Sequence, residues 1–141
     1  MKRSYYIVPL LLLGIAWMRP PAHLKTSWGS YTGGAIDTNA ARAVLDSPLS
    51  VTDNRGGTYT VTRFRFSYRQ KSEYEDSTGK VITNYQLYSR EFYDTPLVDS
   101  LWRSDIQAEV QPGEAYFIDN VVVKNAKGVK ALAPSLELDV Q

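Results

Sequence analysis

The sequence predicts a mainly β fold, an antiparallel immunoglobulin-like β-sandwich with one short helix, and three observations support this prediction. Residues 60–69 alternate strictly between apolar and polar side chains, which is the pattern of a half-buried strand. Alternating or β-rich runs return at 80–89, 115–124 and 136–141, and turn residues separate them. The regular alternation of strands with helices that builds a parallel sheet is missing. A small open barrel is the second architecture that this pattern allows.

Length and composition indicate one globular domain. The chain has 141 residues, of which 43% are hydrophobic and 12% aromatic, so its composition is too apolar for a disordered protein. Its 16 basic residues are balanced by 15 acidic ones, and without a basic excess we expect no nucleic-acid partner. The sequence has no cysteine and one histidine, His23, which excludes disulfides, thiolate metal sites and a histidine cluster. We therefore predict neither a metal site nor a cofactor.

Residues 1–16 have the pattern of an export signal. Lys2 and Arg3 precede a long apolar run, and the next charged residue is Arg19. A basic start followed by about 7–15 apolar residues is typical of a signal peptide, so we expect residues 17–141 in the periplasm, at the cell surface or in the medium. The run is shorter than the roughly 20 apolar residues that cross a bilayer, and we predict no integral membrane span. An uncleaved short anchor is the alternative.

Residues 17–43 are predicted to be a flexible arm or linker, and the β-sandwich domain is predicted to cover residues 44–141. The first segment contains Pro20, Pro21, several glycines and many serine and threonine residues. It shows neither the period of a strand nor that of a helix. Near its end, residues 40–45 fit a helical turn as well as the lead into a first strand.

The first strong strand carries aromatic and basic side chains on opposite faces. Its aromatic face holds Phe64, Phe66 and Tyr68, and its basic face holds Arg63, Arg65 and Arg69. A charged segment at 71–78 and a glycine lead to the next β-rich run, at 80–89. The two runs are predicted to form a hairpin with a long charged tip.

A short helix is predicted after this hairpin. It is expected to begin near Thr95 and Pro96, since threonine favours the N-cap and proline the first helical position. Four apolar residues then recur at the spacing of one helical stripe: Leu97, Val98, Leu101 and Trp102.

The last third of the chain resembles a known family. A turn at 111–114, a strand at 115–124 and a loop at 125–128 read QPGE, AYFIDNVVVK and NAKG. This run resembles the end of the C-terminal domain of the GldM family of gliding-motility proteins from Bacteroidetes, which has the form P-G-D-x-(V/I)-x-(F/I)-x-(D/N)-I-x-V-K followed by a turn with glycine. Residues 61–66 resemble the family's strand of the form V-x-x-F-x-(F/V), and residues 136–140 resemble its alternating final strand.

The resemblance covers residues 45–140 and implies a stand-alone version of this domain, because family members carry a membrane helix and a long periplasmic region before it. It implies a periplasmic β-domain that binds partner proteins close to the type nine secretion and gliding machinery. The family supplies no catalytic residues. We therefore expect an exported, non-enzymatic protein-interaction module of the bacterial envelope, with envelope or secretion-machinery proteins as its partners.

Five residues are candidates for binding the partner, because tyrosine and arginine are enriched in the energetically important centres of protein interfaces. They are Arg63, Arg65, Tyr74, Tyr85 and Tyr88. The tyrosines belong to the predicted hairpin, and the arginines form a stripe on the polar face of its first strand. The competing interpretation is that the tyrosines pack on a pleated surface and the arginines are solvated. An exposed sheet edge that accepts another strand is a further way to bind.

Two other functions stay open. The alternative is a secreted carbohydrate-binding β-domain, in which Trp28, Trp102 or the hairpin tyrosines stack on sugar rings. A small secreted hydrolase would need converging carboxylates, and the candidates are Glu73, Glu75, Asp99 and Asp105.

Two further groups of residues could suggest a catalytic or a calcium site, but we expect neither to form one. His23 is expected to be a solvated residue of the arm, which disfavours a Ser-His-Asp triad. Asp53 and Asn54 are expected to form a turn, because the sequence lacks the spaced acidic ligands of a calcium loop.

Overall fold

Eight strands and two short helices make up the described part of the chain. The computed structural model describes residues 23–141, so the predicted signal peptide at 1–16 lies outside the described residues. In chain order the elements are β1 (Leu24–Trp28), β2 (Gly34–Ile36), α1 (Thr38–Val44), β3 (Leu49–Asp53), β4 (Thr58–Glu75), β5 (Val81–Tyr93), α2 (Ser100–Glu109), β6 (Ala115–Lys124), β7 (Lys130–Ala133) and β8 (Leu136–Val140). Within these residues, neither helix is long and apolar enough to cross a membrane. The prediction of a mainly β fold is confirmed.

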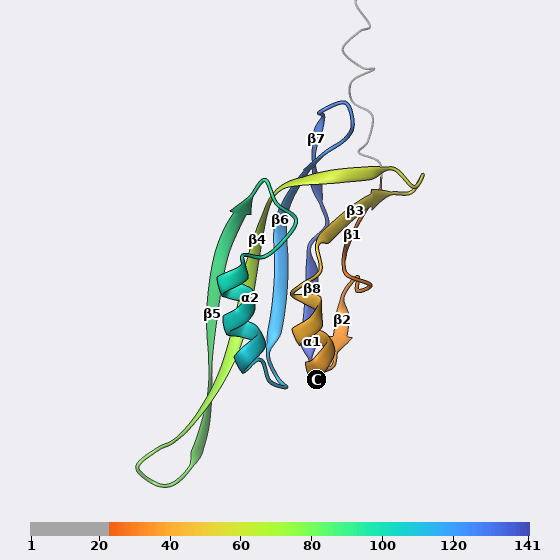
Figure 1. The fold of residues 1–141 in the computed structure, drawn as a ribbon. Helices are drawn as coiled ribbons and strands as arrows, with labels where there is room; N and C mark the ends of the chain where they lie inside the picture. The colour runs from red at the N-terminus through yellow and green to blue at the C-terminus, as the bar shows by residue number, and fades with distance from the viewer. Residues whose placement is uncertain (1–22) are drawn as a thin grey trace, which may run out of the picture.

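The strands form one curled, mixed sheet (Figure 1). Its order is β1-β3-β4-β6-β8-β2, while β5 pairs with β4 and β7 pairs with β6 beside this path. The 18-residue β4 connects all parts, because it pairs with β3 at its start, with β6 over 60–69 and with β5 over 63–75. The two ends of the sheet are consecutive in the chain, and a backbone bridge joins Trp28 to Tyr31 between them.

Two details of the predicted fold class are wrong. The short β2 runs parallel to β8, so the sheet is mixed rather than purely antiparallel. The described residues also contain a second helix, α1, at the segment where helix and strand both fitted the sequence. Its local cause is clear, because the Asp37 carboxylate caps the helix by accepting a hydrogen bond from the Ala40 amide at 2.7 Å. The alanines that follow have the highest helix propensity.

The prediction of a flexible arm at 17–43 is wrong for its described part. β1 pairs with β3 along its whole length, and β2 and α1 follow within the same fold. Trp28 is only 1% exposed, and its indole nitrogen donates a hydrogen bond to the Ser47 carbonyl at 2.8 Å. Strands of five and three residues are too short to show a period, and Gly29 provides the positive φ of 57° that turns the chain between them. The boundary predicted at residue 44 is therefore not a domain boundary in the structure.

The predicted hairpin is confirmed and is longer than expected. β4 and β5 pair without interruption from Arg63–Tyr93 to Glu75–Val81. Phe64 and Phe66 are fully buried, as the alternation predicted. Because β4 pairs with β6 only as far as Arg69, the rest of the hairpin projects from the sheet as a two-stranded ribbon (Figure 1).

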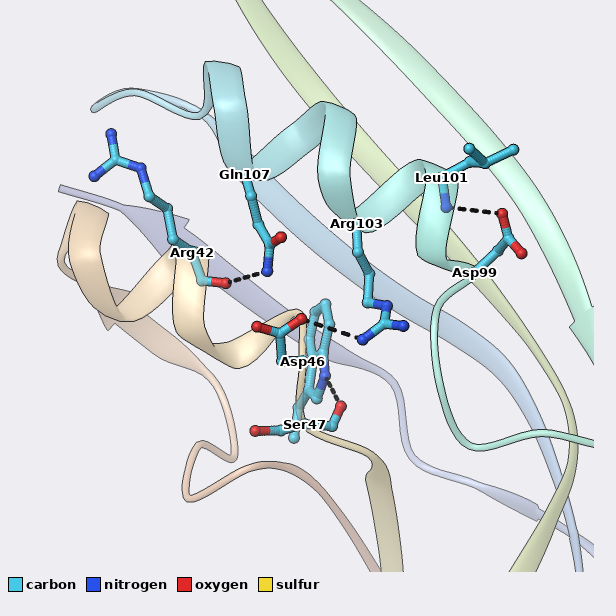
Figure 2. Close-up of polar contacts among 8 residues, drawn as sticks. Arg42, Asp46, Ser47, Asp99, Leu101, Arg103 and Gln107 are labelled. Atoms are coloured by element: carbon cyan, nitrogen blue, oxygen red, sulfur yellow. Dashed lines mark hydrogen bonds and ion pairs between the residues drawn. The ribbon is translucent and has the colours of Figure 1, made fainter.

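Helix α2, the helix that the sequence predicted, starts later than expected. Pro96 stays outside it, because its carbonyl accepts a hydrogen bond from the Leu49 amide at 2.8 Å. Asp99 is the N-cap, and its carboxylate accepts from the Leu101 amide at 3.2 Å (Figure 2). Leu101, expected on the buried stripe, is 73% exposed, whereas Ile106 is buried.

The two helices cover one face of the sheet and contact each other. The Gln107 amide of α2 donates to the Arg42 carbonyl of α1 at 3.0 Å, and Arg103 forms an ion pair of 3.1 Å with Asp46 (Figure 2). Beneath them lies an aromatic cluster in which the rings of Trp28 and Phe66 meet edge to face at 5.6 Å. This helix-covered face therefore holds the core, and the other face of β4, β5 and β6 is left uncovered.

Candidate functional site

The uncovered face of β4, β5 and β6, called the open face below, carries a shallow groove. The alternation that buries Phe64 and Phe66 places the odd-numbered residues of β4 from Arg63 onward on this face. The registers add the odd-numbered residues of β5 on one side and Phe117 and Asp119 of β6 on the other. The groove has a volume of about 500 Å³ and is lined by Arg65, Ser67, Arg69, Tyr85, Leu87, Ser89, Phe117 and Asp119.

The two arginines of the groove are held differently. Arg65 is neutralised by Asp119, since its Nε donates to the carboxylate at 2.8 Å and its Nη2 completes a bidentate ion pair. This hydrogen bond is the main reason that the pKa of Arg65 is raised. The Arg69 guanidinium instead lies 5.4 Å from the centre of the Tyr85 ring and 5.8 Å from that of Phe117. Cation–π contacts of this kind orient a guanidinium without neutralising its charge.

Arg69 therefore keeps its capacity to bind an anion. Among residues 23–141 the ion pairs are formed by other cations, and the buried Nε of Arg69 has no hydrogen-bond partner. Ser67 and Ser89 lie between the two arginines and are joined by a hydrogen bond of 2.7 Å. The groove thus combines one free cation, two aromatic rings and small hydroxyl groups.

The structure divides the five predicted partner-binding residues between two faces. Arg63, Arg65 and Tyr85 belong to the open face, as their pairing with Tyr93, Glu91 and Lys71 shows. Tyr88 pairs with the buried Tyr68 and therefore lies on the face that carries the helices.

Tyr74 lies farther out than the other four. It pairs with Ile82 on the projecting ribbon, on the same face as Tyr88, and it is more than half exposed. The structure thus brings Arg65 and Tyr85 together in one groove and leaves Tyr74 and Tyr88 outside it.

The sequence did not point to five residues that line the groove: Ser67, Leu87, Ser89, Phe117 and Asp119. Alternation within 115–124 already placed Phe117 and Asp119 on a common face. What it could not supply was the register, which sets Asp119 opposite Arg65 and Phe117 opposite Ser67.

A second, smaller groove lies beside α2 on the helix-covered face. It has a volume of about 260 Å³ and is lined by Tyr68, Gln70, Tyr88, Trp102, Asp105, Ile106 and Glu109. Gln70 donates to the Glu109 carboxylate at 2.9 Å, so polar groups of β4 and α2 already contact each other there. Aromatic rings next to carboxylates and an amide are the groups that contact sugars in proteins.

The other sequence candidates are distributed through the fold. Trp28 is in the core, so its assignment to a carbohydrate site is wrong. Asp99 caps α2, Asp105 lines the second groove, and the exposed Glu73 forms an ion pair of 3.2 Å with Lys71. In the part of the chain that the structure describes, no three histidine, cysteine or acidic residues gather as metal ligands would.

The turn interpretation of residues 53–57 is confirmed. The Asp53 carboxylate accepts hydrogen bonds from the amides of Gly57 at 2.7 Å and Arg55 at 2.9 Å. The first of these bonds is the largest cause of the lowered pKa of Asp53. A carboxylate engaged by its own loop in this way stabilises a turn.

Comparisons with known proteins assign no family to this site. No protein-family model matches the chain, and no curated protein matches it.

Proposed function

We propose that the chain is an exported, non-enzymatic protein-interaction domain of the bacterial envelope, a relative of the C-terminal domain of the GldM family. Its proposed partners are envelope or secretion-machinery proteins. The localisation part of the proposal is supported by the signal-peptide pattern of residues 1–16. The interaction part is supported above all by one observation, the uncovered groove in which Arg69 is oriented by Tyr85 and Phe117.

The chemistry of the open face suits an acidic protein segment. Arg63, Arg65, Arg69 and Lys71 follow one another along β4, and within residues 23–141 Asp119 and Glu73 are the acids that pair with members of this row. Arginine and tyrosine contribute large contact areas with directional hydrogen bonds, which is why they are frequent in interface hot spots. An acidic side chain of the partner at Arg69 would find a guanidinium whose orientation is already fixed, and this reduces the entropy lost on binding.

A binding role is also favoured over hydrolysis. The exposed Glu73 and Glu75 lie on the projecting ribbon, Asp99 caps α2 and Asp105 lies by the second groove. A glycosidase needs two carboxylates that face each other across a substrate. We infer from this separation that the chain acts by contact.

Site-specific photocrosslinking in the native envelope tests this proposal. A photoreactive phenylalanine analogue replaces Phe117, in the groove, and in a matched control it replaces the exposed Leu132 of β7. We expect adducts with a defined set of envelope proteins from position 117, and we expect Arg69→Gln to remove them while the control is unaffected. Equal adducts from both positions, or adducts that persist in Arg69→Gln, would overturn the proposal.

Carbohydrate binding is the second candidate function, and the second groove is the observation that favours it. Trp102 and Tyr88 line this groove together with Gln70, Asp105 and Glu109. A glycan that stacks on Trp102 would change its fluorescence, whereas Trp28 is shielded in the core. Titration with a polysaccharide panel should therefore change the emission of the wild type and leave that of Trp102→Phe constant. A constant wild-type emission across the panel excludes this function.

For the finer fold type we propose the immunoglobulin-like sandwich. Its support is that β1 packs across the core, since the Trp28 ring lies 5.6 Å from those of both Phe66 and Tyr116. The small open barrel competes with it, because β1 and β2, the two ends of the sheet, follow each other directly in the chain. An experimental structure decides between them by showing whether β1 and β3 face β6 and β8 as a separate layer.

A further inference from the structure

The longest strand edge on the surface belongs to β5. In the part of the chain that the structure describes, this 13-residue strand pairs with β4 alone, and its other edge is free (Figure 1). Large exposed hydrophobic side chains gather on the same strand. Among nine such residues in the described chain, five belong to β5: Val81, Tyr85, Leu87, Tyr88 and Tyr93.

Over residues 81–89 the edge lacks the features that usually protect such strands. Proteins protect edge strands with charged residues, proline, bulges or a covering element, because free N–H and C=O groups pair readily with another strand. Residues 81–89 contain no charge and no proline. The pairing with β4 runs through 13 consecutive residue pairs without a shift, so no bulge turns the edge away.

Backbone geometry identifies the groups that point to the free edge. Beside the ends of the hairpin, Asp94 donates to the Thr62 carbonyl and Asp76 donates to the Lys80 carbonyl. These pairs continue the register of β4 and β5, and they show that the even-numbered residues of β5 direct their backbone groups toward β4. The odd-numbered residues therefore direct theirs outward. Leu87 is odd-numbered, is the central residue of the strand and is 62% exposed.

We propose that the β5 edge binds the β5 edge of a second copy of this chain, in an antiparallel pair with Leu87 opposite Leu87 on the two-fold axis. This register overlaps the two strands completely. It pairs Val81 with Tyr93 of the second copy and Leu87 with Leu87, so these apolar side chains cover one another. Because the outward backbone groups of both strands belong to odd-numbered residues, this register also pairs them all.

The charge pattern of β5 is compatible with a second copy as the occupant, because the register brings no like charges together. The charged residues of β5 are Arg90 and Glu91. In the proposed register Arg90 faces Asn84 of the second copy and Glu91 faces Thr83, so no like charges oppose each other. The two-fold axis also places both open faces on the same side, and the dimer presents two grooves on one continuous sheet.

Sedimentation of the purified chain over a range of concentrations tests the dimer without any partner, so its outcome is independent of the proposed function. We expect a concentration-dependent dimer, and we expect Leu87→Lys to weaken it at least tenfold because two lysines would meet on the axis. The matched control is Leu101→Lys, which adds the same charge at another exposed leucine, on α2, and should leave the dimer intact. Circular dichroism verifies that each variant is folded. A chain that stays monomeric at all concentrations, or an equal loss in both variants, overturns the proposal.

A disulfide experiment tests the register. The chain has no cysteine, so Leu87→Cys introduces a single thiol. Directly opposed residues of an antiparallel pair have Cα atoms about 5.5 Å apart, within the range that a disulfide spans. Mild oxidation should therefore link Leu87→Cys into a covalent dimer, whereas Leu101→Cys should stay monomeric. Efficient linkage through position 101, or a β5 edge occupied by a different protein while the chain stays monomeric, would contradict the assignment.

Discussion

The hydroxyl of Tyr68 donates a hydrogen bond to the carboxylate of Glu114, and both side chains are buried. Burial, together with this bond, raises the pKa of the Tyr68 phenol, so the hydroxyl keeps its proton at physiological pH. The same carboxylate accepts from the backbone amides of Lys71 at 2.7 Å and Gln111 at 2.8 Å. Glu114 therefore fixes the point at which β4 leaves β6 and the projecting ribbon begins.

We predict that Glu114→Gln destabilises the fold by about 1–3 kcal/mol, because one of the three donors to this buried carboxylate then faces an amide N–H instead of an oxygen. The measurement is the midpoint of denaturant unfolding followed by circular dichroism. The control is Glu137→Gln, which makes the same exchange at an exposed position of β8. Equal midpoints for the two variants would show that the carboxylate is not the structural anchor of the ribbon.

The segment around Trp28 is expected to be essential for folding. Trp28→Ala removes a ring that packs on Phe66 and Tyr116, together with the hydrogen bond to Ser47. Such a truncation costs about 3–5 kcal/mol, a large fraction of the stability of a small domain. Unfolding curves of Trp28→Ala and of the milder Trp28→Phe measure this cost. A truly flexible arm, as the sequence suggested, would give two variants as stable as the wild type.

How much of the fold was predictable depends on the length of each element. β4, β6 and β8 are long enough, or alternate cleanly enough, for their period to be read from the sequence. β1 and β2 are short, and pairing with distant strands decides their structure. The start of α2 was misplaced because Pro96 is held by β3, a tertiary contact that no local pattern contains.

The candidate site was predictable residue by residue but not as a constellation. The alternation within β4 correctly placed Arg63 and Arg65 on the face opposite the core, because this assignment depends on one strand alone. Alternation within β5 sets Tyr85 and Tyr88 on opposite faces, but it could not tell which of them shares the face of the arginines, because that assignment needs the register of two strands. The contribution of Phe117 depends on a third strand and was beyond any local pattern.

The buried end of α1 provides a third prediction. The last carbonyls of a helix have no partner within it, and here the Tyr116 hydroxyl donates to the Ala41 carbonyl at 3.0 Å in the core. Tyr116→Phe leaves that carbonyl unsatisfied and should cost about 1–2 kcal/mol. Gln107→Ala is the matched control, because it removes the corresponding but solvent-exposed bond to Arg42. We expect thermal unfolding to show the larger loss for Tyr116→Phe, and the reverse order would contradict this account.

The tip of the ribbon should respond to acid. The Asp76 carboxylate accepts hydrogen bonds from the Thr78 hydroxyl and from the amides of Thr78 and Lys80, and the Thr78 hydroxyl is the largest cause of its lowered pKa. Because the pKa of Asp76 is lower in the folded state, its ionised carboxylate stabilises the tip at any pH above the ordinary aspartate pKa of about 4. This stabilisation is lost as the pH falls through the folded-state pKa. NMR titration of the Thr78 and Lys80 amides should therefore show a transition below pH 4, which Asp76→Asn removes. A midpoint at or above pH 4, or a transition that persists in Asp76→Asn, would show that the carboxylate does not organise the tip.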